Sequence, residues 1–242
     1  TPVLITKNNT DTITSVLQPL ETFEEVVVFD TGSKDDTIQQ ARKFSNVSIK
    51  TGAFIGFGPT KHLGVSFSNN SWILLLDSDE VMSKELVEEV QNIDLDPNCV
   101  YSIPRSNYIG MKKIRFSGWS PDRVVRLFNR KSTNVSADLV HEKVVVKNLR
   151  EIKLKNPLNH FSYRRVSDFL IKMQRYSTLF YEQNINSTPC HFSKAIFHCW
   201  YAFLKTYFLK LGLLDGREGL LIAMYNSHTT FYKYLMLSYK TK

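Results

Sequence analysis

The stretch that most constrains this chain is an unbroken apolar run, Trp72–Leu76, which ends directly in the carboxylates Asp77, Asp79 and Glu80. An apolar run of this length, bounded by polar residues, is typical of a strand buried on both faces of a parallel sheet. Side chains alternate along an extended segment, so we expect Asp77 and Asp79 to point the same way. Two neighbouring anions repel unless a cation or water lies between them, and a divalent ion with oxygen ligands suits such a pair. The alternative is an acidic turn that only caps the following helix.

Strand-like and helix-like segments alternate through the first hundred residues. Strands are expected at Pro2–Thr6, Glu25–Asp30, Asn46–Lys50 and Trp72–Leu76, and helices at about 12–20, 37–44, 59–68 and 83–90. Alternation in these lengths predicts right-handed βαβ units and a parallel sheet. Ligands bind at the carboxyl ends of the strands in such sheets, which is where Thr6, Asp30 and Asp77 fall.

After Pro97 the pattern changes to strand-like runs without clear helices between them. These runs are Val100–Pro104, Lys112–Phe116, Arg123–Phe128 and Lys143–Lys147. From Ser167 onward helices dominate. The chain is therefore predicted to be an α/β protein with a mixed sheet over residues 1–160, followed by a helical extension over residues 161–242.

The extension differs in charge from the residues before it. Residues 161–242 hold 11 Lys and Arg against 4 Asp and Glu, whereas residues 1–160 hold 20 against 19. Apolar side chains also fall at helical spacing on one face of the extension: Trp200, Phe203, Leu204, Tyr207, Phe208 and Leu211. A basic, aromatic helix of this kind fits a membrane interface. The alternatives are packing into a core, which part of the extension must do, and binding of nucleic acid, for which no known module is present.

Cysteine content and apolar run lengths bear on the compartment. The 3 cysteines have no metal-type spacing, which favours free thiols in a reducing compartment. No signal peptide is visible, and no run reaches about 18 uninterrupted apolar residues. We therefore expect a cytoplasmic protein that contacts a membrane only at its surface.

Three polar residues are candidates for contacts with a nucleotide. Asp30 follows a buried strand beside the strand end at Thr6, where a carboxylate accepts hydrogen bonds from a nucleobase or a ribose hydroxyl. Asp11, in a polar loop, is a second candidate. Lys61 lies on the helix before the central strand, where its charge suits a diphosphate. The alternatives are a helix-capping role for Asp30 and a solvated position for Lys61.

Acids further along the chain are candidates for a general base. Transfer of a sugar to a hydroxyl needs such a base, and both Asp122 and Glu142 qualify. Trp119 offers an apolar face to a sugar ring, and His160 is a candidate third metal ligand. Structural ion pairing is the alternative for each acid, and a structural role is the alternative for the histidine. Four arginines are candidates for gripping an anionic acceptor, with structural pairing equally expected: Arg105, Arg115, Arg123 and Arg126.

Taken together, these segments resemble family 2 glycosyltransferases of the GT-A fold. The resemblance rests on motifs in order: Val3–Thr6 with its Asn/Asp loop, 28–37 (VFDTGSKDDT), Asp77–Glu80, 103–108 (IPRSNY), 114–122 (IRFSGWSPD), 126–130 (RLFNR) and 140–142 (VHE). The later motifs are similar to those of lipopolysaccharide core glucosyltransferases, which add β-glucose to the first heptose of the inner core. The resemblance covers nearly the whole chain, including Asp215 and Gly216 in the extension.

The resemblance implies a GT-A, Rossmann-like nucleotide-sugar-binding domain and an inverting reaction. It also implies a UDP-sugar donor, Mg²⁺ or Mn²⁺, and a peripheral location on the cytoplasmic face of a bacterial inner membrane. In this interpretation Asp11 and Asp30 hold the uridine and Lys61 the diphosphate. Glu142 is preferred to Asp122 as the base. The remaining donor and metal residues of the predicted site are Thr6, Asp77, Ser78, Asp79 and His160.

Rival hypotheses remain at this stage. A nucleotidyltransferase also uses a divalent ion on paired acids, but it releases diphosphate and needs a glycine-rich basic loop that the N-terminus lacks. A non-catalytic scaffold on a membrane binds a UDP-sugar without turnover, and the intact pair Asp77 and Asp79 argues against it. Within the transferase hypothesis, the alternative acceptors are another glycan or a peptide side chain.

Overall fold

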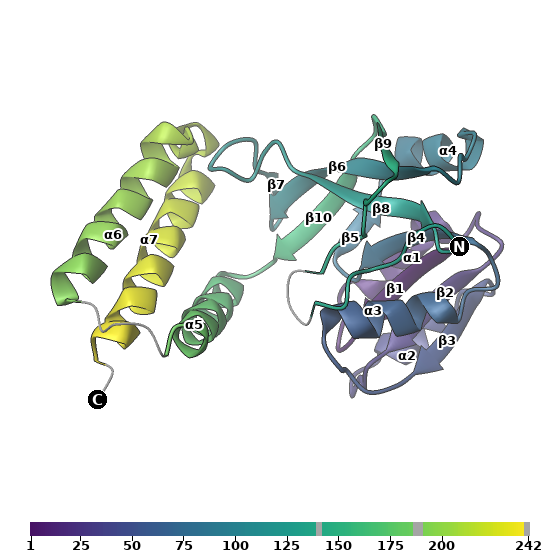
Figure 1. Ribbon diagram of the computed structural model, residues 1–242, viewed down its shortest axis with the longest axis horizontal. Helices are drawn as coiled ribbons and strands as arrows, with labels where there is room; N and C mark the ends of the chain where they lie inside the picture. Colours follow the sequence, from purple (N-terminus) through teal and green to yellow (C-terminus); the bar gives the residue numbers. More distant parts are fainter. Residues whose placement is uncertain (139–141, 186–190, 240–242) are drawn as a thin grey trace. The chain divides into compact units, whose positions relative to one another are not determined.

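The structure is a computed structural model that describes residues 1–138, 142–185 and 191–239. The chain folds into two compact units (Figure 1). The first comprises Thr1–Arg105 and Asp122–His160, and the second comprises Ser106–Pro121 and Phe161–Lys242. The segment 106–121, which the sequence interpretation includes in a domain over residues 1–160, thus groups with the helical extension.

The first unit is built on a sheet with a parallel centre. Strands β3 (Val47–Thr51), β2 (Val26–Asp30), β1 (Pro2–Thr6) and β4 (Trp72–Asp77) lie side by side in that order, and all are parallel. β8 (Arg123–Asn129) pairs antiparallel with β4, and β6 (Cys99–Ile109) pairs antiparallel with β8. The predicted mixed sheet is confirmed.

Short strands complete this unit, and the sequence pattern predicts them poorly. β9 (Arg150–Lys153) runs parallel to β6, and β5 (Glu80–Met82) pairs with β10 (Leu158–Tyr163). Neither β9 nor β10 is predicted, because both are short and largely polar. The predicted strand over 143–147 is wrong: Val144 forms an isolated bridge with Val135, and the backbone of this segment bonds to the adjacent loop.

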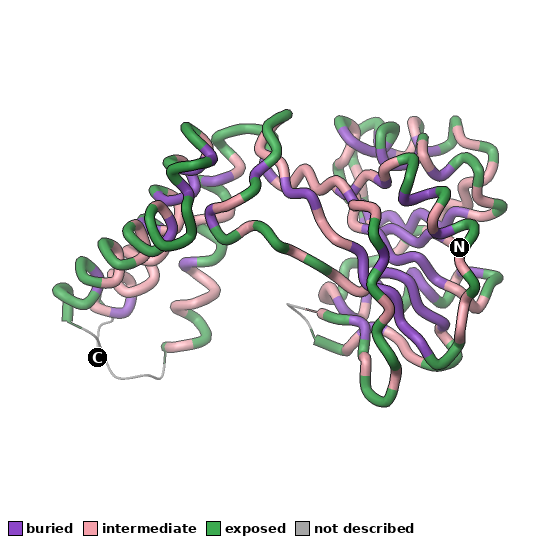
Figure 2. Tube along the Cα trace, turned by 90° about the horizontal axis from the view of Figure 1, so that it is seen from above, coloured by how far each residue is buried: buried purple, intermediate pink, exposed green. Residues whose placement is uncertain are grey.

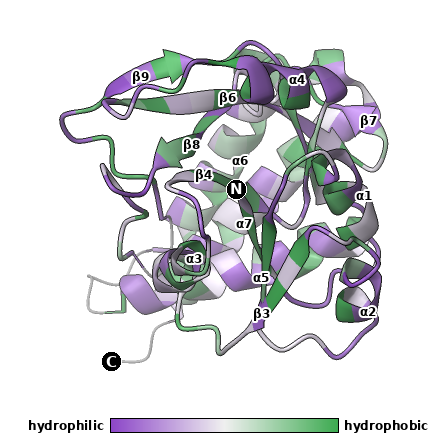
Figure 3. Cartoon of the chain, turned by 90° about the vertical axis from the view of Figure 1, so that its right-hand side faces the viewer, coloured by the Kyte–Doolittle hydropathy of each residue, from purple (hydrophilic) through white to green (hydrophobic). Residues whose placement is uncertain are grey.

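The core explains why β4 is apolar along its whole length. Alternate side chains enter two clusters on opposite faces of the sheet, and hydrophobic residues (green in Figure 3) run along its strands. Leu74 and Leu76 pack in the same cluster as Leu86, whereas Ile73 and Leu75 pack with Val65. The expectation of a strand buried on both faces is therefore confirmed.

Helices lie on both faces of the sheet (Figure 1). They are α1 (Ile13–Leu17), the 3₁₀ turn η1 (Gln18–Leu20), α2 (Thr37–Ala41), α3 (Phe57–Ser66) and α4 (Lys84–Asn92). Ser83 caps α4 as expected, with its hydroxyl accepting a hydrogen bond from the Leu86 N–H at 3.1 Å. Gly64 lets α3 approach the sheet closely, since a Cβ there would lie 2.7 Å from Cδ1 of Ile5.

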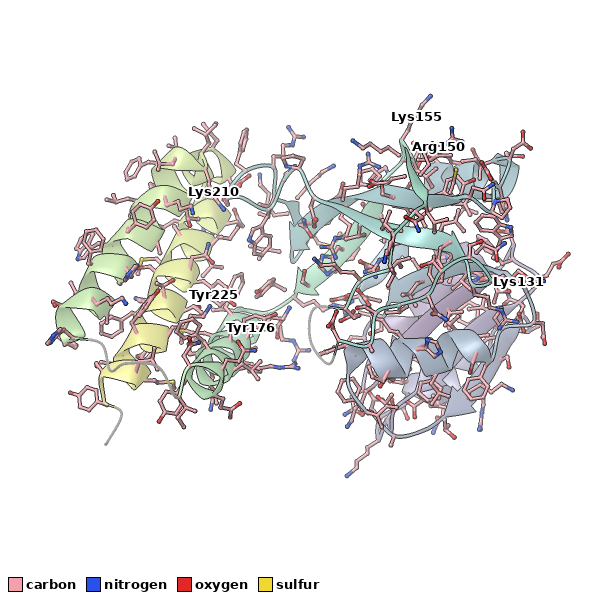
Figure 4. The ribbon with its side chains drawn as sticks, in the orientation of Figure 1. Lys131, Arg150, Lys155, Tyr176, Lys210 and Tyr225 are labelled. Atoms are coloured by element: carbon pink, nitrogen blue, oxygen red, sulfur yellow. The ribbon has the colours of Figure 1, made fainter. Side chains whose placement is uncertain are left out.

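The second unit is helical after β10. It contains α5 (Val166–Gln183), α6 (Phe192–Leu204), the π-helical segment η2 (Lys205–Leu209), the 3₁₀ turn η3 (Gly212–Asp215) and α7 (Arg217–Ser238). α7 packs against both α5 and α6, and Tyr225 of α7 and Tyr176 of α5 are labelled in Figure 4. The prediction that helices dominate after Ser167 is confirmed for the described residues.

Small side chains form part of the contact between α6 and α7. Ala195, on α6, and Ala223, on α7, are fully buried, and the Ser227 hydroxyl donates to the Cys199 carbonyl at 3.0 Å. Small residues let helix backbones approach closely. Ring pairs complete the contact: Phe192 with Phe231 and His198 with Tyr234. Other large side chains of α6 are exposed, and Figure 2 shows much of this helix as exposed. No helix in the described ranges is long and apolar enough to cross a membrane.

The segment 106–121 is held by the tail of the chain, which explains its place in the second unit. Of the strand expected over Lys112–Phe116, only β7 (Lys112–Lys113) forms. The Ile114 N–H still donates to the Asn107 carbonyl of β6 at 2.9 Å, but the N–H groups of Arg115 and Phe116 donate to the carboxylate of Asp215 at 2.9 and 3.0 Å.

Candidate active site

Three of the predicted residues lie at one edge of the parallel sheet. Thr6 is opposite Asp30 in the pairing of β1 with β2, and Ile5 is opposite Asp77 in the pairing of β1 with β4. The carboxyl ends of three neighbouring strands therefore place these polar groups together. This is the position at which α/β sheets bind ligands.

The loops that follow β1 and β2 hold each other in place. The Asn9 N–H donates to the Thr37 hydroxyl at 2.8 Å, and the Asn8 side chain accepts from the Lys34 N–H at 2.8 Å. Asp30 is buried, and its carboxylate accepts hydrogen bonds from the N–H groups of Gly32 and Ser33 at 3.1 Å. Asp30 thus shapes its own loop, while contact with a nucleoside stays a prediction, as it does for the exposed Asp11.

Asp77 lies between two basic side chains. Its Oδ1 is 2.5 Å from Nζ of Lys61, and its Oδ2 accepts a hydrogen bond from Nη2 of Arg126. Lys61 also contacts Oε1 of Glu142 at 2.6 Å, so one ammonium joins the predicted metal ligand to the predicted base. Lys61 is not the solvated helix residue of the alternative interpretation, because its side chain is only 5% exposed.

Glu80 anchors the other side of this cluster. It is fully buried in β5; its Oε1 contacts Nη2 of Arg126 at 2.5 Å, and its Oε2 accepts the Asp77 N–H at 3.0 Å. Arg126 is also buried, and its Nε has no hydrogen-bond partner in the described part of the chain. Arg126 therefore forms ion pairs with Asp77 and Glu80. These are the structural pairs that the sequence analysis gave as the alternative to binding an acceptor.

The electrostatic balance favours ionised groups. Burial raises the pKa of Asp77, but the charges of Arg126 and Lys61 outweigh burial and hold that pKa well below its usual range. Burial lowers the pKa of Arg126, but Asp77 and Glu80 more than compensate and raise it above its usual value. Asp77 is therefore a carboxylate at every physiological pH.

Asp122 is tied to the same cluster through Arg105. Nε and Nη2 of Arg105 each lie 2.8 Å from Oδ2 of Asp122, and Nη1 lies 3.3 Å from Oε1 of Glu80. Arg123 donates instead to the carbonyls of Ser102 and Leu154 at 2.7 and 3.0 Å. Both arginines are therefore in structural pairs.

Asp79 and His160 lie together beyond the turn that contains Ser78. Asp79 Oδ2 is 3.6 Å from His160 Nε2, because His160 is opposite Glu80 in the pairing of β10 with β5. Two ligands of one ion, each about 2.1 Å from it, stand about 3 Å apart. This pair suits a shared cation, although within the described ranges no three His, Cys, Asp or Glu side chains converge on one point.

Trp119 and Arg115 lie in the second unit. The Trp119 ring stacks on Tyr163 with centroids 5.2 Å apart, and its carbonyl accepts from Nδ2 of Asn107 at 2.8 Å. Arg115 has an exposed side chain. Their roles toward an acceptor stay predictions. The predicted motif residues Val140 and His141 lie outside the described residues.

Comparison with known proteins now places the chain in a family. Residues 4–201, most of the chain, match the model of glycosyl transferase family 2. The chain belongs to glycosyl transferase family 2. An uncharacterized glycosyltransferase of Rickettsia typhi is 27% identical over 234 residues, which are 89% of this chain and 78% of that protein. The predicted family and α/β fold are thereby confirmed.

Two solved structures give the scale of the structural likeness. A mannosyltransferase of Pyrobaculum calidifontis, solved with GDP-Man and Mn²⁺, matches with a TM-score of 0.51 at 13% identity, covering 92% of this chain and 72% of that chain. Staphylococcus aureus TarS 1–349 matches with a TM-score of 0.42 at 17% identity, and the match covers 74% of this chain and 64% of that one. The first likeness shows a shared fold.

The sequence analysis does not predict the ion-pair partners of two members of the charge cluster, Glu80 and Arg126. Glu80 is visible only as the third acid of its motif, and nothing local indicates that it is fully buried against an arginine 46 residues away. A charged residue inside an otherwise apolar strand is the available signal for Arg126, which interrupts the run Val124–Phe128.

The low pKa of Asp77 predicts how stability depends on pH in EDTA-treated protein. A carboxyl whose folded pKa lies below the unfolded value of about 3.9 stabilises the fold above that pH and loses its contribution as pH falls toward the folded pKa. The free energy of urea unfolding should therefore fall more steeply below about pH 4 for wild type than for Asp77→Asn. The exposed Asp94→Asn is the control and should follow wild type. Parallel curves for wild type and Asp77→Asn would contradict the pairing.

Proposed function

We propose that this family 2 glycosyltransferase transfers a hexose from a UDP-sugar, specifically glucose from UDP-glucose, to a heptose of a lipopolysaccharide core, with inversion. The observation that carries the donor side is the cluster of Lys61, Asp77 and Glu142 at the carboxyl edge of the sheet. One cation there contacts two carboxylates, so an incoming diphosphate has a cation to pair with and acids to hold a metal.

The donor nucleotide is proposed to bind across the ends of β1, β2 and β4. The mutually bonded loops after β1 and β2 form a pre-ordered support for the uridine, with Asp11, Asp30 and Thr6 as its polar contacts. Lys61 pairs with the diphosphate, and Ser78 lies in the adjoining turn. The choice of UDP rests on the resemblance; the mannosyltransferase of similar fold was solved with a GDP-sugar.

A divalent ion, Mg²⁺ or Mn²⁺, is proposed to be held by Asp77, Asp79 and His160. Magnesium in enzymes is usually held by one or two carboxylates together with substrate phosphate oxygens. The 3.6 Å approach of Asp79 to His160 suits this arrangement. Such an ion neutralises the charge that grows on the departing diphosphate.

Lys61 links the donor site to the proposed base, because its ammonium lies 2.6 Å from Oε1 of Glu142. Glu142 takes the proton of the acceptor hydroxyl as this oxygen attacks the anomeric carbon and the nucleoside diphosphate departs. Asp122 is the alternative base.

Nucleotide release tests this function. The panel of donors is UDP-glucose, UDP-galactose, UDP-N-acetylglucosamine and GDP-mannose. We expect one of them to release its nucleoside diphosphate in the presence of Mn²⁺ and a truncated lipopolysaccharide core. Asp79→Ala should lower this rate by about 100-fold or more, since each 1.4 kcal/mol of lost stabilisation is tenfold. Asp94→Ala, in an exposed loop, is the matched control.

Each rival function gives a different result in this assay. Release of inorganic pyrophosphate would indicate nucleotidyl transfer. Nucleotide binding without release from any donor would indicate a scaffold. Equal rates for wild type and Asp79→Ala would contradict the proposed metal site, and transfer only to another glycan or a peptide would replace the proposed acceptor.

We also propose that the second unit binds an anionic membrane surface, at the cytoplasmic face of a bacterial inner membrane, where a lipid-linked acceptor is found. The surface is the outer face of α6 and the turns after it. Its large side chains are mostly exposed: Phe197 (69%), Trp200 (64%), Tyr201 (50%), Leu204 (46%), Phe208 (51%), Leu209 (74%), Leu213 (43%) and Leu214 (57%).

The charge of this outer face fits anionic lipid better than a second copy of the chain. Residues 191–214 contain Lys194, Lys205 and Lys210 but no Asp or Glu. Two such faces brought together repel each other, whereas each lysine near an anionic bilayer contributes about 1 kcal/mol of attraction. Exposed aromatic side chains beside lysines are the arrangement expected of a helix lying in a lipid interface.

Vesicle cosedimentation tests the membrane proposal. We expect binding to phosphatidylglycerol vesicles that is at least about tenfold tighter than to phosphatidylcholine vesicles and weakens with salt. The triple substitution Phe197→Ser, Trp200→Ser and Leu204→Ser should remove most of this binding by deleting buried apolar area. Phe54→Ser with Ile55→Ser, exposed residues of the first unit, is the control. Unchanged binding of the triple variant would contradict the assignment of this face.

A further inference from the structure

The segment 106–121 contains the end of β6, all of β7 and the loop that follows. Arg105 precedes this segment and Asp122 follows it; both belong to the charge cluster of the first unit, and two contacts join them. The Arg105 N–H donates to the Asp122 carbonyl at 2.9 Å, and the guanidinium contacts the Asp122 carboxylate at 2.8 Å. Arg105 also reaches Glu80. Any residue that fixes the far part of this loop therefore acts on a segment whose two ends lie at the candidate site.

Asp215 is the residue that fixes the far part of the loop. Its side chain is buried, and its Oδ1 accepts the Arg115 N–H at 2.9 Å. Its Oδ2 accepts the Phe116 N–H at 3.0 Å and the Ser117 hydroxyl at 2.7 Å. Hydrogen bonds to an ionised acceptor are stronger than neutral ones. Three donors on the consecutive residues Arg115, Phe116 and Ser117 thus bind one carboxylate. That carboxylate belongs to a residue about 100 positions further along the chain.

The backbone of the loop needs such an anchor. Ser117 has a φ of +60°, and Gly118 has a φ of +78°. A non-glycine residue in the left-handed region is strained. The Ser117 N–H donates to the carbonyl of Lys210, the residue after η2, at 2.9 Å, so Lys210 and η3 hold this turn from two sides. Figure 4 marks Lys210 at the end of the α6–α7 pair, where this loop meets the tail.

The turn held by Asp215 leads directly into Trp119. The Trp119 N–H donates to the Phe116 carbonyl at 3.0 Å, which continues the same turn. Its ring is half-buried and stacks on Tyr163, while Asn107 bonds its carbonyl. The backbone of Trp119 is therefore set by the residues that Asp215 binds, and its ring direction is set by Tyr163.

We propose that Asp215 is a positioning residue for the acceptor: its carboxylate holds the loop 114–119 in the shape that presents Trp119 and Arg115 to the acceptor sugar. This inference rests on the proposed function, because it assumes a sugar acceptor at Trp119. Asp215 itself touches neither donor nor acceptor. It acts through the loop backbone, so acceptor recognition depends on a residue of the helical tail.

Limited trypsin digestion tests the hold on the loop without requiring activity. The exposed Lys112, Lys113 and Arg115 offer cleavage sites, and mass spectrometry identifies the fragments. Asp215→Asn should increase the cleavage rate at these sites by about tenfold or more, since cleavage follows the open population. Asp168→Asn is the matched control, because Asp168 also accepts two backbone N–H groups in the same unit, from Arg164 and Arg165 at 2.8 and 2.9 Å.

Kinetics test the consequence for the acceptor. Asp215→Asn should raise the KM for the acceptor by about tenfold or more, and Ser117→Ala, which removes one of the three hydrogen bonds, should raise it less. The KM for the donor and the slow release of UDP to water without acceptor should stay at wild-type values in both variants. Asp168→Asn should leave all of these constants unchanged.

The outcomes separate this inference from the proposed function. Faster cleavage together with a selective rise in acceptor KM supports it. Unchanged cleavage, or faster cleavage with an unchanged acceptor KM, overturns it. An equal loss of donor and acceptor steps also overturns it, because that result indicates a general loss of structure. If wild type transfers no sugar, the proposed function fails together with the acceptor role, whatever the cleavage result.

Discussion

The pairing of Asp77 with Lys61 and Arg126 is the interaction on which the polar edge of the first unit depends. An apolar strand ends there in carboxylates, and burying them is costly unless cations compensate their charge. Lys61 reaches Asp77 from α3, and Arg126 reaches it from β8 while also binding the fully buried Glu80. Lys61 also pairs with Glu142, and Asp122 joins the same cluster through Arg105, which contacts Glu80. Charge compensation therefore assembles the candidate site before any ligand enters.

The second unit follows a different packing rule. Its helices α6 and α7 contact each other through small residues and two ring pairs, while other aromatic side chains of α6, such as Phe197 and Trp200, are exposed. The same unit fixes the loop 106–121 through Asp215. The exposed outer face of α6 is the surface proposed to bind lipid, and Asp215 of the same unit binds the backbone of residues 115 and 116. The proposed acceptor is carried by lipid. The same unit is therefore proposed both to bind the lipid surface and to hold the loop that contacts the acceptor.

Local sequence patterns predicted much of this and failed where contacts are distant. The run Trp72–Leu76 gave the central strand, because burial on both faces requires continuous apolar residues. The predicted helix that begins near Ser83 likewise depends on near neighbours, because the Ser83 hydroxyl accepts the Leu86 N–H. The partners of Arg126, and of Asp215, lie 46 to 100 residues away and leave no local signal. The segment 143–147 has the composition of a strand, yet its backbone hydrogen-bonds to an adjacent loop. Composition alone does not indicate which backbone partner a segment will find.

Calorimetric titration of UDP with and without Mn²⁺ tests the central claim most directly, because it reports on the acidic edge without requiring the acceptor. The account predicts that wild type binds UDP in Mn²⁺, and that EDTA or Asp79→Asn weakens the binding by about tenfold or more, since an ion shared by protein and diphosphate is lost. Equal UDP affinity with and without Mn²⁺, in both wild type and Asp79→Asn, would contradict the assignment of Asp77, Asp79 and His160 as the metal-binding group of the donor site.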